Sequence, residues 1–159
     1  MGADGRLAWA AGANGWNGAV VTITNEGLLK LRQGSTPVWD HRGVRYDRLL
    51  PNQVLRPGES IAATSKAWSM TMRTDGNLVL TSAAGTRKWA SFTAGTGSYA
   101  AMQTDGNFVV RNKQGTVQWS TKTSGAGSVM RVLGTGNAAV YRSSTVTWAV
   151  VGGPAPQDW

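Results

Sequence analysis

The chain repeats a similar pattern about every 30 residues, and a repeat of this length restricts it to folds built from several like units. Three clear copies occupy residues 70–91, 100–121 and 129–150, and a weaker copy occupies residues 21–40. Recurring asparagines and tryptophans mark the three clear copies: Asn77, Asn107, Asn137, Trp89, Trp119 and Trp148. We therefore expect one small unit of structure per copy, packed against its neighbours.

Each copy is expected to form three short strands joined by tight turns. In the second clear copy, the strands are predicted over residues 98–103, 108–111 and 117–121. The Thr-Asp-Gly-Asn sequence at 104–107 favours a tight turn because Asp-Gly readily adopts positive φ, and Gly115 serves the next turn in the same way. The 21 glycines of the chain likewise favour strands and turns over helices.

Alternation of side chains along these strands predicts the core. The residues expected on the core side are Met72, Leu78, Leu80, Met102, Phe108 and Val110. The opposite side is expected to expose Gln103, Val109 and Arg111 beside the turn. The periodic tryptophans are expected to pack in the interior rather than to stack on a ligand: Trp9, Trp39, Trp89, Trp119 and Trp148.

The composition excludes several kinds of site. The chain has no cysteine and a single histidine, His41, so we expect no disulfide, no metal site and no cofactor. It contains no run of about 20 apolar residues that could span a membrane. The formal charge of +8 comes from cations scattered along the chain, which favours a basic surface over nucleic-acid binding.

One copy carries a motif that resembles a known family. Gln103-x-Asp105-x-Asn107-x-Val109 resembles the Q-x-D-x-N-x-V-x-Y signature of the bulb-type (monocot-type) mannose-binding lectins, with Arg111 in place of the tyrosine. The likeness covers roughly two thirds of the chain. It implies an all-β, β-prism II fold of three four-stranded antiparallel sheets in a pseudo-three-fold arrangement. It also implies one potential mannose pocket per sheet.

The residue types of this motif suit a sugar. The carboxylate of Asp105 accepts hydrogen bonds from hydroxyl groups, and the amides of Gln103 and Asn107 both donate and accept them. Val109 offers an apolar wall to the C–H face of a sugar ring. Arg111 donates but cannot accept, and its charge favours an acidic or phosphorylated glycan.

The other copies depart further from the signature. A weaker second carbohydrate site is predicted at Arg73, Asp75, Asn77 and Val79, where Arg73 replaces the glutamine and is expected to pair with Asp75. The third copy keeps only the asparagine and the tyrosine of the motif, and the N-terminal copy keeps none of it. Neither of these two copies is expected to bind sugar.

The domain organisation follows from where the resemblance begins. Residues 46–151 are assigned to a B-lectin domain, whose opening strands resemble residues 47–61, and residues 152–159 to a C-terminal tail. Residues 1–45 resemble the last part of a preceding lectin domain and cannot close a three-sheet core alone. We therefore expect another protein chain or a second copy to pair with residues 1–45 or with the tail. The alternatives are that residues 1–45 were cut from a longer tandem protein and that the tail is a loose end.

The function expected from these features is a carbohydrate-binding lectin that recognises D-mannose-type glycans on cell surfaces. The tandem arrangement resembles that of bacterial lectin-like bacteriocins, which implies a secreted context in which the chain targets an antibacterial toxin, although no signal peptide is visible in this chain. The alternative is an interaction prism that has lost sugar binding and docks protein partners, because Thr-Asp-Gly-Asn also forms a good turn without a ligand.

An enzyme is not expected. Asp75 and Asp105 could be imagined as a glycosidase pair, but they occupy equivalent places in two copies and should point apart on different sheets. The sequence also lacks a nucleophile–histidine–acid set and a phosphate-binding loop.

Overall fold

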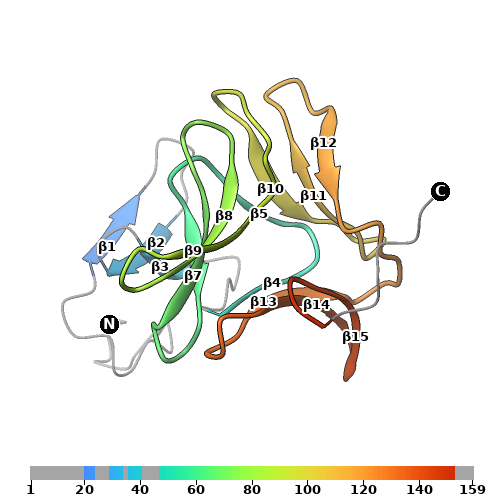
Figure 1. The fold of residues 1–159 in the computed structure, drawn as a ribbon. Coiled ribbons are helices and arrows are strands. Elements are labelled where there is room, and N and C mark those ends of the chain that lie inside the picture. Colours follow the sequence, from blue (N-terminus) through green and yellow to red (C-terminus); the bar gives the residue numbers. More distant parts are fainter. Residues whose placement is uncertain (1–19, 24–28, 34–35, 41–46, 153–159) are drawn as a thin grey trace, which may run out of the picture.

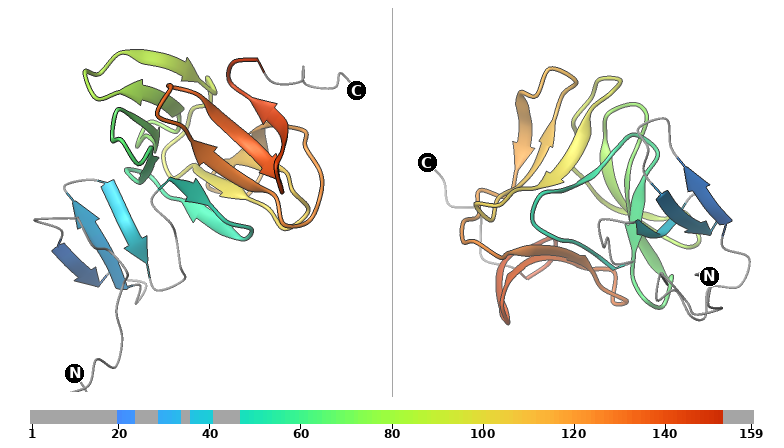
Figure 2. Two further views of the ribbon diagram at one scale, coloured as in Figure 1. Left: turned by 90° about the horizontal axis from the view of Figure 1, so that it is seen from below. Right: turned by 180° about the vertical axis from the view of Figure 1, so that it is seen from behind.

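The computed structural model describes residues 20–23, 29–33, 36–40 and 47–152. The regular elements in these ranges are β-strands of two to five residues, labelled β1 to β15. They form three four-stranded sheets around a common core, and one three-stranded sheet on the N-terminal side (Figure 1). Figure 2 shows the three-stranded sheet as a separate layer beside the other three.

Each clear copy of the repeat contributes three consecutive antiparallel strands to one four-stranded sheet. We call the sheet of copy 70–91 the first sheet, that of copy 100–121 the second and that of copy 129–150 the third. Their strands are β7 (Trp68–Met72), β8 (Leu78–Ser82), β9 (Arg87–Ala90), β10 (Tyr99–Met102), β11 (Phe108–Arg111), β12 (Val117–Ser120), β13 (Val129–Val132), β14 (Ala138–Arg142) and β15 (Thr145–Ala149).

The segment that precedes the copies supplies the fourth strand of every sheet. β4 (Arg48–Leu49) pairs with β13, β5 (Gln53–Leu55) pairs with β10, and β6 (Ser60–Ala62) pairs with β7. All three pairings are antiparallel, and each buries one large apolar side chain in the core: Leu49, Leu55 and Ile61. One stretch of chain thereby links three copies that are far apart in the sequence.

Three of the periodic tryptophans meet where the sheets converge. The ring centroids of Trp89, Trp119 and Trp148 lie 5.1–5.8 Å apart, in edge-to-face arrangements with interplanar angles of 65–75°. Trp148 is buried, and the other two are partly buried against the core. The predicted packing role is confirmed for these three, whereas Trp9 and the side chain of Trp39 lie outside the described part of the structure.

The core contains the residues that alternation predicted. All six of them are fully buried in one apolar cluster: Met72, Leu78, Leu80, Met102, Phe108 and Val110. Because residues two apart on a strand share a face, the residues between them lie on the outer faces of the sheets. The outer faces are therefore where a ligand can reach the protein.

The N-terminal sheet consists of β1 (Val20–Ile23), β2 (Leu29–Gln33) and β3 (Thr36–Asp40), in that order. The pairing of β2 with β3 shifts register between Leu31 and Arg32. The other three sheets shift register at the corresponding places: Leu80/Thr81, Val110/Arg111 and Val140/Tyr141. β3 lies next to β6, and both Lys30 and Arg32 form ion pairs with Glu59. This sheet therefore has the local structure of a fourth copy.

The predicted β-prism II fold, with three four-stranded antiparallel sheets, is confirmed. The boundaries proposed at residues 45 and 151 stay predictions, because residues 41–46 and 153–159 lie outside the described ranges. Within those ranges, no helix has the length and apolar character needed to cross a membrane.

Candidate functional site

The connection between β10 and β11 brings the three polar residues of the motif together. The backbone N–H of Gln103 donates to the carbonyl of Asn107 at 2.9 Å, and the N–H of Gly106 donates to the carbonyl of Gln103 at 3.2 Å. Gly106 has a φ of +95°, which a residue without Cβ adopts at least cost. The turn predicted over residues 104–107 is therefore confirmed.

The carboxylate of Asp105 is fixed in orientation but retains an open oxygen. Its Oδ1 accepts the backbone N–H of Asn107 at 2.9 Å, and its backbone carbonyl accepts the N–H of Gly125 at 2.6 Å. The residue is exposed, and no group in the described part of the chain bonds to Oδ2. A carboxylate oxygen held in this way can accept a hydrogen bond from a hydroxyl group of a ligand.

Asn107 combines a structural contact with a free donor. Its Oδ1 accepts the hydroxyl of Thr121 at 3.1 Å and so holds the segment that follows β12. Asn77 makes the equivalent contact with Ser91 at 3.2 Å in the first sheet. The side-chain NH₂ of Asn107 and the side chain of half-buried Gln103 have no hydrogen-bond partner among the described residues, which leaves both amides available to a ligand.

Val109 is buried, so the prediction that it would be exposed is wrong. It lies on the outer face, as its alternation with Phe108 and Val110 requires, but none of its surface is accessible. The physical reason is that β11 is an inner strand, so Val109 lies between its cross-strand neighbours Ala101 and Ser120. Val109 therefore forms the floor beneath the outer face, and a sugar could touch it only after neighbouring side chains move.

Arg111 contacts its own hairpin. A guanidinium N–H donates to the carbonyl of Gly115, and the pairing of β11 with β12 shifts register between Val110 and Arg111. Directly across the strand pair lies Tyr99, a residue that the sequence analysis did not select. Its place four residues before Gln103, and thus on the same face, could have identified it.

The first sheet carries a closed version of the same turn. Oδ1 of Asp75 accepts the N–H of Asn77 at 3.0 Å, as in the second sheet, but Oδ2 lies 2.8 Å from the guanidinium of Arg73. The predicted pairing of Arg73 with Asp75 is therefore confirmed. Both side chains are about half exposed, so the pair is weak as a source of stability, but it occupies the oxygen that a sugar would need.

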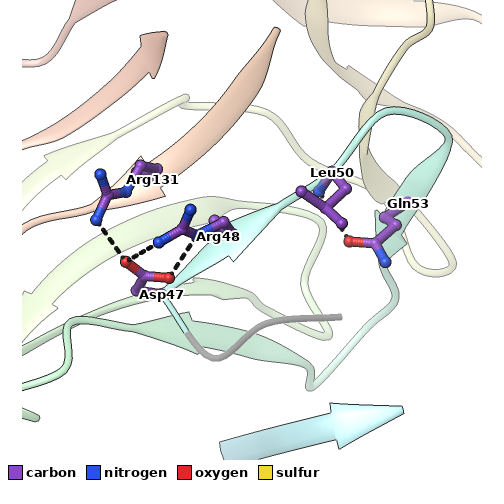
Figure 3. Close-up of polar contacts among 5 residues, drawn as sticks. All are labelled: Asp47, Arg48, Leu50, Gln53 and Arg131. Carbon is purple, nitrogen blue, oxygen red and sulfur yellow. Dashed lines mark hydrogen bonds and ion pairs between the residues drawn. The ribbon is translucent and has the colours of Figure 1, made fainter. Parts of the chain in front are cut away.

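The outer face of the third sheet is occupied by a charged cluster (Figure 3). Arg131 and Arg48 both bind the carboxylate of Asp47, at 2.7 Å each, and the Arg131 guanidinium also lies 5.8 Å from the ring centroid of Tyr141. Burial on its own raises the pKa of Asp47, but the hydrogen bonds and charges of Arg48 and Arg131 outweigh it and hold the pKa below the usual value for an aspartate. Arg131 therefore fills the face where this copy would present a sugar pocket.

Asp75 and Asp105 stand on different sheets, one between β7 and β8 and the other between β10 and β11, as predicted. In the described part of the chain, no three His, Cys, Asp or Glu residues gather to hold a metal ion. Of the N-terminal copy, Lys30 and Arg32 contact Glu59, and Thr24, Glu26 and Leu28 lie outside the described residues.

Comparison with solved structures places this arrangement among lectins. A lectin from Allium sativum shares 30% identity over 62% of this chain and 96% of its own, with a TM-score of 0.56. A monomeric monocot mannose-binding lectin from Gastrodia elata shares 27% identity over 68% and 99% (TM-score 0.59). The mannose-specific agglutinin from snowdrop, Galanthus nivalis, shares 28% over 68% and 98% (TM-score 0.55).

Comparison with protein-family models gives no match, and comparison with curated proteins gives none either. The structural likeness nevertheless extends over almost the full length of these lectins. The chain therefore belongs to the bulb-type (monocot-type) mannose-binding lectin family.

Proposed function

We propose that the second sheet binds a D-mannose-type glycan at Gln103, Asp105, Asn107, Val109 and Arg111, with Val109 as the buried floor of the site. The observation that carries this proposal is the open Oδ2 of Asp105, which lies in a hydrogen-bonded turn beside two amides with free hydrogen-bonding groups. One acceptor and two groups that both donate and accept can satisfy adjacent sugar hydroxyls, each of which donates and accepts.

The relatives support the class of ligand. The snowdrop agglutinin is described as mannose-specific and was solved with methyl-α-D-mannoside, and the Gastrodia elata proteins are described as mannose-binding. In the present chain, the proposed ligand interacts mainly with the second sheet, because Arg73 occupies the equivalent carboxylate oxygen in the first sheet. The site at Arg73, Asp75, Asn77 and Val79 is accordingly the weaker one.

The first test compares Asp105→Ala with Asp75→Ala. Both changes delete the same turn hydrogen bond to an asparagine N–H, so their costs in stability should match. We expect only Asp105→Ala to reduce binding of methyl-α-D-mannoside, by about tenfold or more, because only Asp105 has an open oxygen. Titration of ¹⁵N-labelled protein followed by NMR measures this even at the millimolar affinities that are about typical of single sugar pockets.

A third variant sharpens the comparison. Arg73→Gln removes the ion pair and creates Gln-x-Asp-x-Asn-x-Val in the first sheet. We expect it to increase binding at the Asn77 turn while binding at the Asn107 turn stays unchanged. If Asp75→Ala abolishes mannoside binding and Asp105→Ala does not, the site lies in the first sheet and the proposal is overturned.

The cellular role follows from the ligand and is proposed with it. Glycans on a cell surface are reached from outside, so we place the protein in the extracellular space. A single weak pocket needs several linked copies to give useful avidity. Pairing of two chains through residues 1–45 would bring two second-sheet pockets together and so serve that need, and targeting of an antibacterial toxin is the context that we propose for it.

We further propose that residues 1–45 are the last part of a preceding lectin-like domain and pair with a second copy of the chain. The sheet β1–β3 has the register of a repeat copy, but its order in the described residues ends at β1, where the other sheets add an opening strand. β1 exposes Val20, Val21 and Ile23, which are 61%, 58% and 75% accessible. An edge strand that carries only Val, Thr and Ile favours pairing with another strand.

Sedimentation velocity tests this partner. We expect the full chain to form a dimer that Ile23→Lys converts to a monomer, because a charge on an edge strand opposes strand pairing. The matched control is Val117→Lys, which changes an exposed apolar residue on β12, the edge strand of the second sheet. A monomeric wild-type chain, or equal effects of the two variants, would contradict the pairing.

An interaction prism without sugar binding is the second candidate function. It is favoured by the ion pair in the first sheet and the charged cluster in the third, which leave one open motif among the three complete sheets. The same NMR titration separates the candidates. A wild-type chain that shows no shift at the Gln103–Asn107 turn with any mannoside would favour the interaction prism.

A further inference from the structure

A pocket lies on the outer face of the second sheet, at the end away from the Asp105 turn. It has a volume of about 400 Å³ and is lined by Val54, Arg56, Pro57, Gly97 and Tyr99. Its walls come from β5 and the residues after it, from β10, and from the loop before β10. It is thus built from the opening segment and the second copy together.

The pocket shares its face with the proposed mannose site. Tyr99 and Gln103 are four residues apart on or next to β10, so both project from the outer face. At about 3.3 Å per residue, the two side chains start about 13 Å apart. Ala101 and Val109 form the floor between them, and Arg111 lies opposite Tyr99.

The chemistry of the pocket differs from that of the turn. It combines an aromatic ring and apolar Val54 and Pro57 with the guanidinium of Arg56, all partly or fully accessible. Two more cations border it: Arg111 across the strand pair, and Lys113, whose aliphatic chain packs over Gly97.

The other sheets do not repeat this arrangement. The register places Ser69 in the first sheet and Val129 in the third at the position that Tyr99 occupies in the second. The aromatic ring therefore occurs in the sheet whose signature turn keeps an open carboxylate oxygen. Both features point to one extended binding face on the second sheet.

We propose that this pocket is a second subsite that takes a sugar residue bearing an anionic group, linked to the mannose in the first subsite. The inference rests on the proposed function. The ring of Tyr99 packs against the C–H face of the sugar, and the guanidinium of Arg56 binds the carboxylate or phosphate. Arg111 and Lys113 add a positive field at the rim, which makes the preference for an anion sensitive to salt.

The test uses three disaccharides with mannose at one end: a neutral mannobiose, the same disaccharide with a phosphate on the second residue, and mannose linked to glucuronic acid. We expect at least one anionic disaccharide to bind about tenfold tighter than mannobiose in low salt, the gain expected of a charge-assisted hydrogen bond. Comparison of the phosphorylated disaccharide with the one that carries glucuronic acid identifies which anion the pocket prefers.

Two variants and a control show whether the tighter binding of the anionic disaccharide depends on the pocket. Arg56→Gln and Tyr99→Ser should each remove the advantage of the anionic disaccharide while leaving the affinity for methyl-α-D-mannoside unchanged. Arg87→Gln removes an exposed arginine from β9 in the first sheet and should leave the advantage intact. Equal losses in Arg56→Gln and Arg87→Gln would show an effect of net charge and overturn the subsite.

The two proposals fail in different ways. If methyl-α-D-mannoside does not bind the wild-type chain, the proposed function is wrong. If it binds but the anionic disaccharides gain nothing over mannobiose, the proposed function stands and the second subsite is wrong.

Discussion

Gly106→Ala is expected to destabilise the protein by about 3–5 kcal/mol, far more than an alanine at a glycine whose missing Cβ would meet no neighbouring atom. Two effects add at this position. The φ of +95° is costly for any residue with a Cβ, and an added Cβ would lie 2.3 Å from the carbonyl oxygen and 2.5 Å from the nitrogen of Gly125. Both of these atoms belong to backbone, so the clash can be relieved only by moving the turn or the loop.

The chain offers a matched control at Gly115. Its φ is +89°, but nothing lies within 4 Å of the place where its Cβ would be. Gly115→Ala should therefore show the conformational cost alone, about 1–2 kcal/mol. Denaturation by urea measures both variants, and equal losses of stability would mean that the contact between the turn and Gly125 contributes nothing.

The same variant tests how the site is built. The carbonyl of Asp105 accepts the N–H of Gly125 at the point where the turn and the loop touch. Displacement of the turn should therefore also weaken mannoside binding under conditions in which Gly106→Ala is still folded, whereas Gly115→Ala should bind like the wild type. The glycine of the motif thus supports the site without touching the ligand.

The local structure of each copy could be predicted from the sequence because it depends on residues close together in the chain. The strand predicted over residues 108–111 is observed over the same residues, and the neighbouring strands begin or end one residue from their predicted limits. Alternation and the Asp-Gly turn determine these elements. The inward direction of Phe108 and Val110 follows from the same local pattern.

The parts that could not be predicted depend on contacts between distant segments. β4 has two residues, too few to show any periodicity, and its partner β13 lies about 80 residues later. Burial of Val109 likewise depends on the strands on either side of β11. At the site, alternation alone could have selected Tyr99, but the pocket beside it requires Arg56 from the opening segment.

Trp148→Ala is expected to cost about 3–5 kcal/mol, a large part of the stability of a small domain. Trp148 is buried to 6% accessibility, and its ring contacts those of Trp89 and Trp119, each from a different sheet. Its removal leaves a cavity at a place where all three copies meet. Because no disulfide reinforces the core, nothing covalent compensates for the loss.

The control removes an aromatic ring outside the core. Phe92 is 81% accessible, and Phe92→Ala should change the free energy of unfolding by no more than about 0.5 kcal/mol. Trp148→Phe keeps part of the buried volume and should fall between the two, which preserves the test if Trp148→Ala does not fold. Urea denaturation followed by near-ultraviolet circular dichroism reports the packing of the tryptophans directly. Equal stabilities of Trp148→Ala and Phe92→Ala would mean that the sheets are held together by the opening strands rather than by the three indole rings.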